Sequence, residues 1–304
     1  EANSAPLKEK IVMKKKSIII SLLVALVVVI GVAVGVKAFV DHQAAKNQRI
    51  VATSAAITEI FDKLDIDLVG VPTTQAKLPS RYKDVTKIGS PMDPSVEKIA
   101  SLNPTVVYAV STLKDQYNDA FKQQAVKVTY LKLDTVAQLK GTLTSLGKEY
   151  HRTSQAQAQI EKINSAITAV KKRIHGQKPK VLVLMGMPGA GYMIATDKSY
   201  VGDLVRLAGG QNVYAANGQT YISPNNESLA TKKPDVILRL EHALPNVTKP
   251  QFEKEFSTNP VWKTMPAVKN KRVYDLQQPT FNASANMNAA KALKQVSQWL
   301  YPSK

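Results

Sequence analysis

The sequence predicts an α/β protein of two similar lobes with parallel sheets, joined by a single long helix. Segments 93–107 and 223–237 repeat one pattern at a constant offset of 130 residues: a helix start with proline, a short helix, a second proline and a β-branched strand. Between the copies, segment 153–174 has the apolar spacing of an amphipathic helix. Chance recurrence of a common helix-to-strand turn is the alternative explanation of the repeat.

The connecting helix is predicted from its apolar residues, which recur every three or four positions and fall on one stripe. The stripe consists of Ile160, Ile163, Ile167, Val170 and Ile174. Thr153 or Ser154 is expected to cap its start, and His175-Gly176 to end it. Such a helix is about 30 Å long, so it can act as a strut between the lobes.

Each predicted lobe alternates strands with helices. In the N-terminal lobe, 49–150, we expect strands at 49–52, 68–71, 106–110 and 126–131 and helices at 55–64 and 136–150. Residues 151–176 form the connection. In the C-terminal lobe, 177–304, we expect strands at 181–185, 236–240 and 272–276 and a helix at 200–208. This alternation indicates parallel sheets that are covered on both faces.

Composition excludes some partners. The 304 residues are 44% hydrophobic and 21% charged, with a net charge of +18. Residues 1–38 hold six lysines and two glutamates, so the remainder carries +14, which suits anionic surroundings or an anionic ligand. We expect no nucleic-acid partner, because the chain has neither a paired-cysteine zinc pattern nor an aromatic ribonucleoprotein motif.

The N-terminal region predicts export. Lys14 to Lys16 precede an uncharged run at 18–36, which is typical of an export signal with its positive end in the cytoplasm. We therefore divide the region into a cytoplasmic N-terminus (1–16), a signal peptide or membrane anchor (17–40) and a tether (41–48). The uncharged run is compatible with a signal peptide that is cleaved near Ala38 and also with an uncleaved membrane anchor. The absence of cysteine excludes disulfides, thiolate chemistry and a lipid-modified N-terminal cysteine.

Several motifs together resemble a known family. Segment 49–60, Leu207-Ala208-Gly209-Gly210, Asn259-Pro260-Val261-Trp262 and segment 267–274 occur in the order found in the helical-backbone solute-binding proteins of metal-chelate ABC importers. The resemblance covers 49–302 and implies the class III periplasmic-binding-protein fold of two Rossmann-like lobes. Within the family, segments 89–94 and 238–245 resemble the haem-binding member of iron-regulated surface determinant systems.

The resemblance implies a function and a ligand set. It implies a receptor without catalysis that binds haem and passes it to an ABC permease and its ATPase. The implied iron ligands are Met92 and His242, one from each lobe. Glu97 and Glu227, one on each lobe, are the implied permease contacts. It also implies the outer face of the cytoplasmic membrane of a Gram-positive bacterium, with upstream cell-wall haem carriers as further partners. The chain departs from the family in lacking its lipid-modified cysteine, so the expected anchor is the N-terminal helix of the apolar run.

The residues support the two ligands independently. Ligands of open α/β sheets bind beyond the carboxyl ends of the strands. His242 follows the predicted strand 236–240 by two residues, and Met92 directly precedes the helix start expected at Asp93-Pro94. Pro91 stiffens the same loop. The alternative for Met92 is a gap-filling core methionine.

Other residues are candidates for contact with the rest of a haem. Lys77, Arg81 and Tyr82 follow the second strand and, with the helix start at Thr53 and Ser54, are candidates for the propionates. Segment 186–191 is interpreted as a glycine-rich strand-to-helix turn lining the cleft, since no Lys-Ser or Lys-Thr follows as in a phosphate loop. Met187 and Tyr192 there fit an apolar wall for a porphyrin or ordinary core packing.

Three other functions are alternatives to a haem receptor. The same fold could carry a ferric siderophore or a corrinoid, for which arginine and tyrosine would matter more than Met92 and His242. A surface haem-modifying metalloenzyme would need an acid or base beside the iron, and the sequence shows no catalytic constellation. A surface adhesion module would bind no chromophore. His42, His151 and His175 have no partner at metal-ligand spacing.

Overall fold

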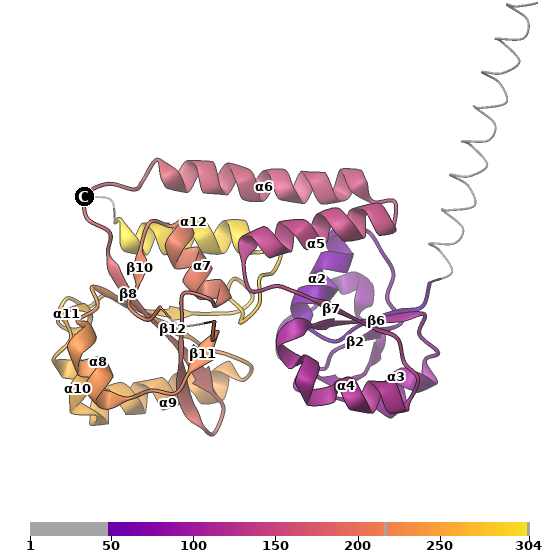
Figure 1. Cartoon of the computed structure of the whole chain (residues 1–304), viewed down its shortest axis with the longest axis horizontal. Coiled ribbons are helices and arrows are strands. Elements are labelled where there is room, and N and C mark those ends of the chain that lie inside the picture. Colours follow the sequence, from indigo (N-terminus) through magenta and orange to yellow (C-terminus); the bar gives the residue numbers. More distant parts are fainter. Residues whose placement is uncertain (1–47, 216–217, 303–304) are drawn as a thin grey trace, which may run out of the picture. The chain divides into compact units, whose positions relative to one another are not determined.

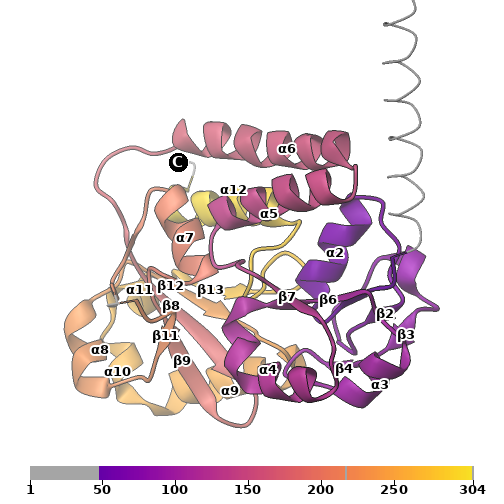
Figure 2. The same cartoon turned by 45° about the vertical axis from the view of Figure 1, so that its right-hand side comes forward.

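The computed structural model describes residues 48–215 and 218–302. Residues 49–302 belong to one compact unit, and the predicted segments 1–16 and 17–40 lie outside the described residues, as does most of the tether 41–48. Among the described residues, no helix is both long and apolar enough to cross a bilayer. The compact unit has two lobes with α6 running along both (Figures 1 and 2).

The N-terminal lobe is built on a five-stranded sheet in the order β3-β2-β1-β6-β7, and every neighbouring pair is parallel. Its strands are β1 (Ile50–Ala52), β2 (Gly70–Val71), β3 (Thr86–Lys87), β6 (Val106–Val110) and β7 (Val128–Leu131). The central strands β1 and β6 are buried, as expected of a sheet covered on both faces.

Helices and one small hairpin complete this lobe. The helices are α2 (Ala55–Lys63), α3 (Val96–Ser101), α4 (Lys114–Gln123) and α5 (Val136–Glu149), with 3-10 turns η1 (Ser80–Tyr82) and η2 (Ser111–Leu113). The hairpin pairs β4 (Gly89–Ser90) with β5 (Asp93–Pro94) in antiparallel fashion. Helix α4 and the hairpin are elements that the sequence pattern did not indicate.

The C-terminal lobe has a six-stranded sheet of mixed direction. Its main order is β11-β9-β8-β12-β13, and β10 pairs with β8. The strands are β8 (Lys180–Met187), β9 (Gly191–Ala195), β10 (Gln211–Asn212), β11 (Tyr221–Ile222), β12 (Val236–Leu240) and β13 (Val273–Leu276). Strands β10, β8, β12 and β13 are parallel, whereas β9 returns antiparallel to β8. The expected strand-to-helix turn at 186–191 is therefore wrong: the segment is the turn of a β-hairpin.

The described residues of this lobe form six helices. They are α7 (Tyr200–Leu207), α8 (Asn226–Lys232), α9 (Pro245–Thr258), α10 (Pro260–Lys263), α11 (Pro266–Lys269) and α12 (Ala289–Leu300). Helix α9 lies against β8 and β9, and Gly186 allows this close approach. A Cβ at Gly186 would lie 2.9 Å from both Phe252 and Thr248 of α9.

Helix α6 (Thr153–Lys171) is the predicted connection, three residues shorter at its end than 153–174. It packs on α5 of the first lobe and on α12 of the second (Figures 1 and 2). Its stripe is buried at Ile163 and Val170. The expected cap by Thr153 or Ser154 is wrong, because the N-cap residue is Arg152 and no side chain caps the helix. Packing on two helices stabilises α6 instead.

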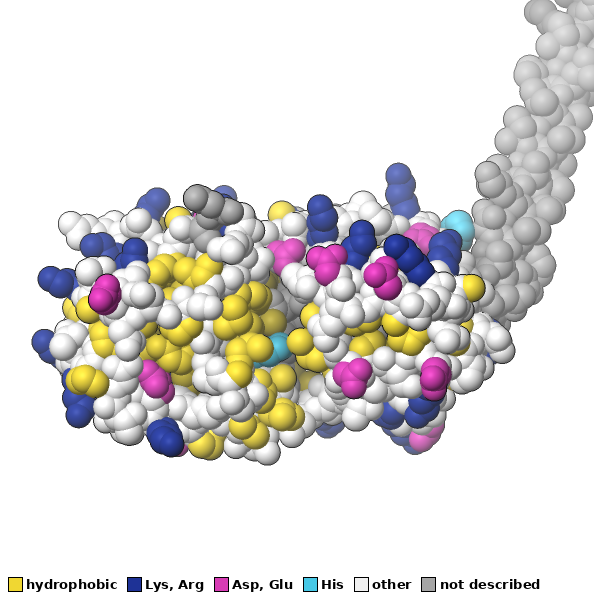
Figure 3. Space-filling model, turned by 60° about the horizontal axis from the view of Figure 1, so that its bottom comes forward, with side chains coloured by type: hydrophobic (Ala, Val, Ile, Leu, Met, Phe, Trp, Pro, Cys, Tyr) yellow, Lys and Arg dark blue, Asp and Glu magenta, His cyan; other side chains and the backbone are white. Residues whose placement is uncertain are grey.

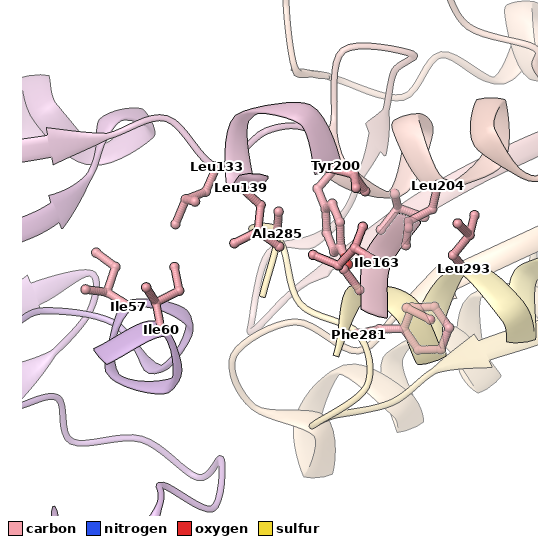
Figure 4. Packing of buried hydrophobic residues seen from close by; sticks show 14 of the residues in the cluster. Ile57, Ile60, Leu133, Leu139, Ile163, Tyr200, Leu204, Phe281, Ala285 and Leu293 are labelled. Atoms are coloured by element: carbon pink, nitrogen blue, oxygen red, sulfur yellow. The ribbon is translucent and has the colours of Figure 1, made fainter. Parts of the chain in front are cut away.

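A continuous hydrophobic core passes from one lobe to the other. Figure 4 shows Leu139 of α5, Ile163 of α6, Tyr200 of α7 and Phe281 meeting in one cluster, and all four are buried. Separating the lobes would expose this closely packed apolar surface to water, which is unfavourable. The lobes are therefore fused along their α5–α6–α12 side.

The repeat that predicted two lobes is present in the structure. Helices α3 and α8 begin at Val96 and Asn226, and strands β6 and β12 begin at Val106 and Val236, both 130 residues apart. The N-caps are Ser95 and Asn225, whose side chains accept hydrogen bonds from the first helical turn. The expected helix start at Asp93-Pro94 is thus wrong, since those residues form β5. The predicted fold class is confirmed.

Candidate functional site

Loops that follow the carboxyl ends of strands from both lobes meet at the junction of the lobes. Leu133 follows β7 in the N-terminal lobe, and its carbonyl accepts a hydrogen bond of 2.7 Å from the N–H of Ala285, which follows β13 in the C-terminal lobe. Both residues are buried. Ligands of open α/β sheets bind at this edge of the strands. The junction is therefore where loops of both lobes can hold one ligand.

Met92 lies at the tip of the β4–β5 hairpin, beyond the carboxyl end of β3. Gly89 pairs with Pro94 and Ser90 with Asp93, so Pro91 and Met92 form the turn. Only three large hydrophobic side chains of the described residues are exposed, and Met92 is one of them at 42%. The alternative of a gap-filling core methionine does not fit this exposure. The hairpin presents the thioether to solvent at the sheet edge.

His242 follows β12 by two residues, as predicted. Its carbonyl accepts from the N–H of Leu244 at 2.7 Å, and Ala243 between them has a φ of 59°, so the chain turns sharply here. Burial lowers the pKa of the His242 imidazole. The ring is therefore neutral near pH 7 and has a nitrogen lone pair for a metal.

Met187 and Tyr192 flank the turn of the β8–β9 hairpin beside His242. Because Leu240 of β12 pairs with Met185 of β8, His242 and Met187 each stand two residues beyond the same register pair. The hairpin and α9 enclose a hollow of about 640 Å³. Its apolar lining includes Met187, Tyr192, Met193, Pro224 and Phe252.

The hollow extends the site along α9 without enclosing the two candidate ligands. Met92 and His242 are not among its lining residues. Leu244, next to the histidine turn, is 37% exposed. Figure 3, which views the molecule from the side of α4 and α9, shows hydrophobic side chains gathered around a histidine. An apolar face of this kind suits a flat, mostly apolar ligand.

Two of the expected propionate contacts are wrong. Tyr82 is 1% exposed, and its hydroxyl donates to the carbonyl of Ile66. Arg81 binds Asp65 at 2.7 Å and Asp67 at 2.8 Å. Both aspartates precede β2, so the guanidinium is directed to the amino edge of the sheet, opposite the site.

Three other predicted contacts remain at the carboxyl edge. Thr53 and Ser54 form the β1–α2 turn, where the Ser54 hydroxyl accepts from the N–H of Ile57 at 3.3 Å. Thr53 is buried, so at this turn backbone N–H groups are better placed than its side chain to meet a carboxylate. Lys77 is exposed in the loop after β2. Its ammonium is free to reach an anionic group.

Glu97 and Glu227 occupy equivalent positions. Each is the second residue of its helix, α3 or α8, and each is exposed. A carboxylate in the first turn is favoured by the helix dipole. The repeat therefore places one negative charge at the same point of each lobe.

Sequence reasoning missed the contribution of α9. This helix supplies Phe252, Gln251 and Glu255 to the hollow. Pro250 lies inside it, which hid the helical pattern. The proline at its first position, Pro245, was the available signal.

Comparison with known proteins identifies the family. A family model described as periplasmic binding protein matches residues 50–280. The chain belongs to the periplasmic binding protein family. Within it, the chain is 45% identical over 258 residues to the high-affinity heme uptake system protein IsdE of Staphylococcus aureus strain Newman, covering 84% of this chain and 88% of IsdE.

Solved structures agree with this assignment. The chain is similar to S. aureus IsdE complexed with heme, with 44% identity, a TM-score of 0.80 and coverage of 84% of this chain and 99% of the other. An ABC transporter substrate-binding protein from Listeria monocytogenes EGD-e is 40% identical, with a TM-score of 0.77 and coverage of 84% and 99%. The family resemblance expected from the sequence is confirmed, as is the expectation of a binding protein rather than an enzyme.

Proposed function

We propose that this chain is an extracytoplasmic receptor that binds haem and delivers it to an ABC permease. The proposal is supported by the positions of one thioether and one imidazole: Met92 lies in a hairpin turn after β3 of one lobe, and His242 follows β12 of the other. The relative of 45% identity is named as a heme uptake protein.

The two side chains suit the iron of haem. Methionine and histidine are a recognised axial pair, and the thioether favours the reduced iron more than a second imidazole would. His242 is neutral because burial lowers its pKa, so no proton must leave before the nitrogen binds the metal. With one ligand from each lobe, the iron would join the lobes.

The rest of the site suits a porphyrin. Met187, Tyr192 and Leu244 offer apolar contact beside the imidazole. Lys77 and the N–H groups at the β1–α2 turn would meet the propionates. The net charge of +18 would also favour an anionic ligand.

Delivery requires a membrane partner. Glu97 and Glu227, exposed on equivalent helices, would bind basic residues of a permease, and the duplicated geometry suits a permease of two-fold symmetry. Its ATPase would drive uptake. We further propose that segment 17–40 holds the receptor at the outer face of the cytoplasmic membrane of a Gram-positive bacterium, where cell-wall carriers would supply the haem.

Titration of haemin into the full chain, purified in mild detergent, tests haem binding. We expect a saturable shift of the Soret band at one haem per chain that excess ferric siderophore or cobalamin does not reverse. Displacement by either competitor would assign the site to that ligand class instead. A failure to saturate would contradict the proposal.

A further inference from the structure

The tip of the β4–β5 hairpin is tied to a neighbouring helix by one side chain. Nε2 of Gln116, in the first turn of α4, donates a hydrogen bond to the carbonyl oxygen of Met92, 24 residues away in the chain. Among the described residues, it is the one hydrogen bond that joins the turn residues Pro91 and Met92 to another element. It acts on the backbone of the residue whose side chain is the candidate iron ligand.

The base of the hairpin is fixed separately. The N–H of Thr73 donates to the carbonyl of Gly89 at 2.8 Å, and the N–H of Ser95 donates to that of Ile88 at 2.8 Å. Gly89 has a φ of 99°, and a Cβ there would lie 2.8 Å from the carbonyl oxygen of Asp93. The hairpin therefore needs glycine at this point, and its base cannot shift without breaking these contacts.

Gln116 itself stands on a rigid support. The next residue, Tyr117, is buried, and its ring lies 5.4 Å from that of Phe121 one turn later in an edge arrangement. These two side chains anchor α4 to the sheet of the N-terminal lobe. The backbone of Gln116 is thus held in place outside the hairpin, and its exposed side chain extends from there to the carbonyl of Met92.

We propose that Gln116 is a positioning residue that directs the thioether of Met92 toward the iron. The inference rests on the proposed function, since it concerns how the haem is held. Methionine has three rotatable side-chain bonds, and Met92 is 42% exposed, so side-chain packing does little to fix it. Fixing its backbone lowers the conformational cost of forming the sulfur–iron bond.

The hydrogen bond from Gln116 acts at Met92, so it should affect the sulfur–iron bond and not the imidazole–iron bond. Gln116 bonds to the backbone of Met92 on the N-terminal lobe, and it is not among the residues that line the hollow along α9. Its loss should therefore leave the imidazole–iron bond intact and shift the equilibrium between six-coordinate and five-coordinate iron. A single hydrogen bond of this type corresponds to about a two- to tenfold change in that equilibrium.

The test compares substitutions in the haem-loaded full chain by absorption spectroscopy and redox titration. Gln116→Ala removes the donor, and Gln116→Glu places an acceptor-only carboxylate against the carbonyl. We expect both to raise the five-coordinate fraction about two- to tenfold and to lower the midpoint potential toward that of Met92→Ala. Gln116→Lys restores a donor and should recover part of the six-coordinate state. Gln123→Ala, an exposed glutamine on the same helix, is the matched control.

The outcomes separate the inference from the proposed function. If Met92→Ala alters the spectrum while both Gln116 variants match the unsubstituted protein, the positioning role is overturned and haem ligation by Met92 stands. If Met92→Ala itself has no effect on the spectrum or potential, the ligand assignment fails and the role of Gln116 fails with it. Equal effects of Gln116→Ala and Gln123→Ala would also overturn the inference, because they would indicate a general effect on α4.

Discussion

Oδ2 of Asp203, in α7 of the C-terminal lobe, accepts a hydrogen bond of 2.8 Å from the backbone N–H of Val136, the first residue of α5 in the N-terminal lobe. The first N–H groups of a helix have no partner within the helix. One lobe thus caps a helix of the other. Asp203 is 3% exposed, and Arg206 binds its second oxygen at 3.1 Å.

Removal of this cap should loosen the junction. Asp203→Ala leaves the N–H of Val136 buried without an acceptor, and we expect a loss of about 1–3 kcal/mol in the free energy of unfolding, measured with urea. Asp203→Asn retains an acceptor oxygen and should lose less. The control is Asp235→Ala, whose carboxylate accepts from Lys180 N–H at 2.7 Å within one lobe. An equal or smaller loss for Asp203→Ala than for this control would contradict the cap between lobes.

A half-buried acid at the same junction should make stability depend on pH. Burial raises the pKa of Glu59 in α2 from 4.5 to about 7, against smaller opposing effects of the Met287 backbone and Lys63. Its Oε2 atom is buried without a hydrogen-bond partner. Because the folded chain binds this proton more tightly than the unfolded chain, the contribution favours folding at low pH and is lost as the pH rises from about 4.5 to about 7.

Glu59→Gln should abolish that part of the pH dependence. Above pH 7 the variant should be more stable than the unsubstituted protein by about 1–3 kcal/mol, whereas at pH 4.5 the two should be similar. Urea unfolding at the two pH values measures the difference. Glu161→Gln, on the exposed face of α6, serves as the control. A Glu59→Gln effect that does not change with pH would show that the carboxyl titrates normally.

The fused lobes should move little when haem binds. Helix α6 packs on both lobes, and one hydrophobic core joins them. We expect the radius of gyration from solution scattering to change by less than about 1 Å on haem addition. A decrease of several ångströms would mean that the lobes close as flexible-hinge receptors do.

Charge reversal at the repeated glutamates should separate docking from binding. Glu97→Arg with Glu227→Arg should abolish haem uptake through the cognate transporter while haem affinity and melting temperature stay nearly unchanged, because both side chains are exposed in first helical turns. Each single reversal should weaken docking in a salt-dependent way. Reversal of the exposed Lys98, the next residue of α3 after Glu97, to glutamate gives a control for charge reversal on the same helix. Uptake by the double glutamate variant at the unsubstituted rate would leave both residues as helix-start residues.

Elements with a long hydrophobic pattern, or with a copy elsewhere in the chain, could be predicted from the sequence. Strands β6 and β12 were expected at their observed bounds, because buried parallel strands are continuous apolar runs. The β4–β5 hairpin was not expected, since strands of two residues have no alternation to read. Met92 was therefore expected directly before a helix, whereas it lies at a hairpin tip.

Contacts between distant residues explain the wrong site predictions. Arg81 follows β2 in sequence, yet its partners Asp65 and Asp67 draw it to the opposite edge. Tyrosine is a residue type often found in binding sites, but the hydroxyl of Tyr82 donates a hydrogen bond to the buried carbonyl of Ile66. Only the folded arrangement reveals such pairings, because no local pattern encodes them.

The absorption spectrum of the haem-loaded full chain tests the two proposed iron ligands most directly. With Met92 and His242 both bound, the iron should be low-spin and six-coordinate. His242→Ala should leave haem five-coordinate or weakly held, and Met92→Ala should mainly alter the reduced form. A Soret band in the double variant identical to that of the unsubstituted protein would contradict ligation by this pair.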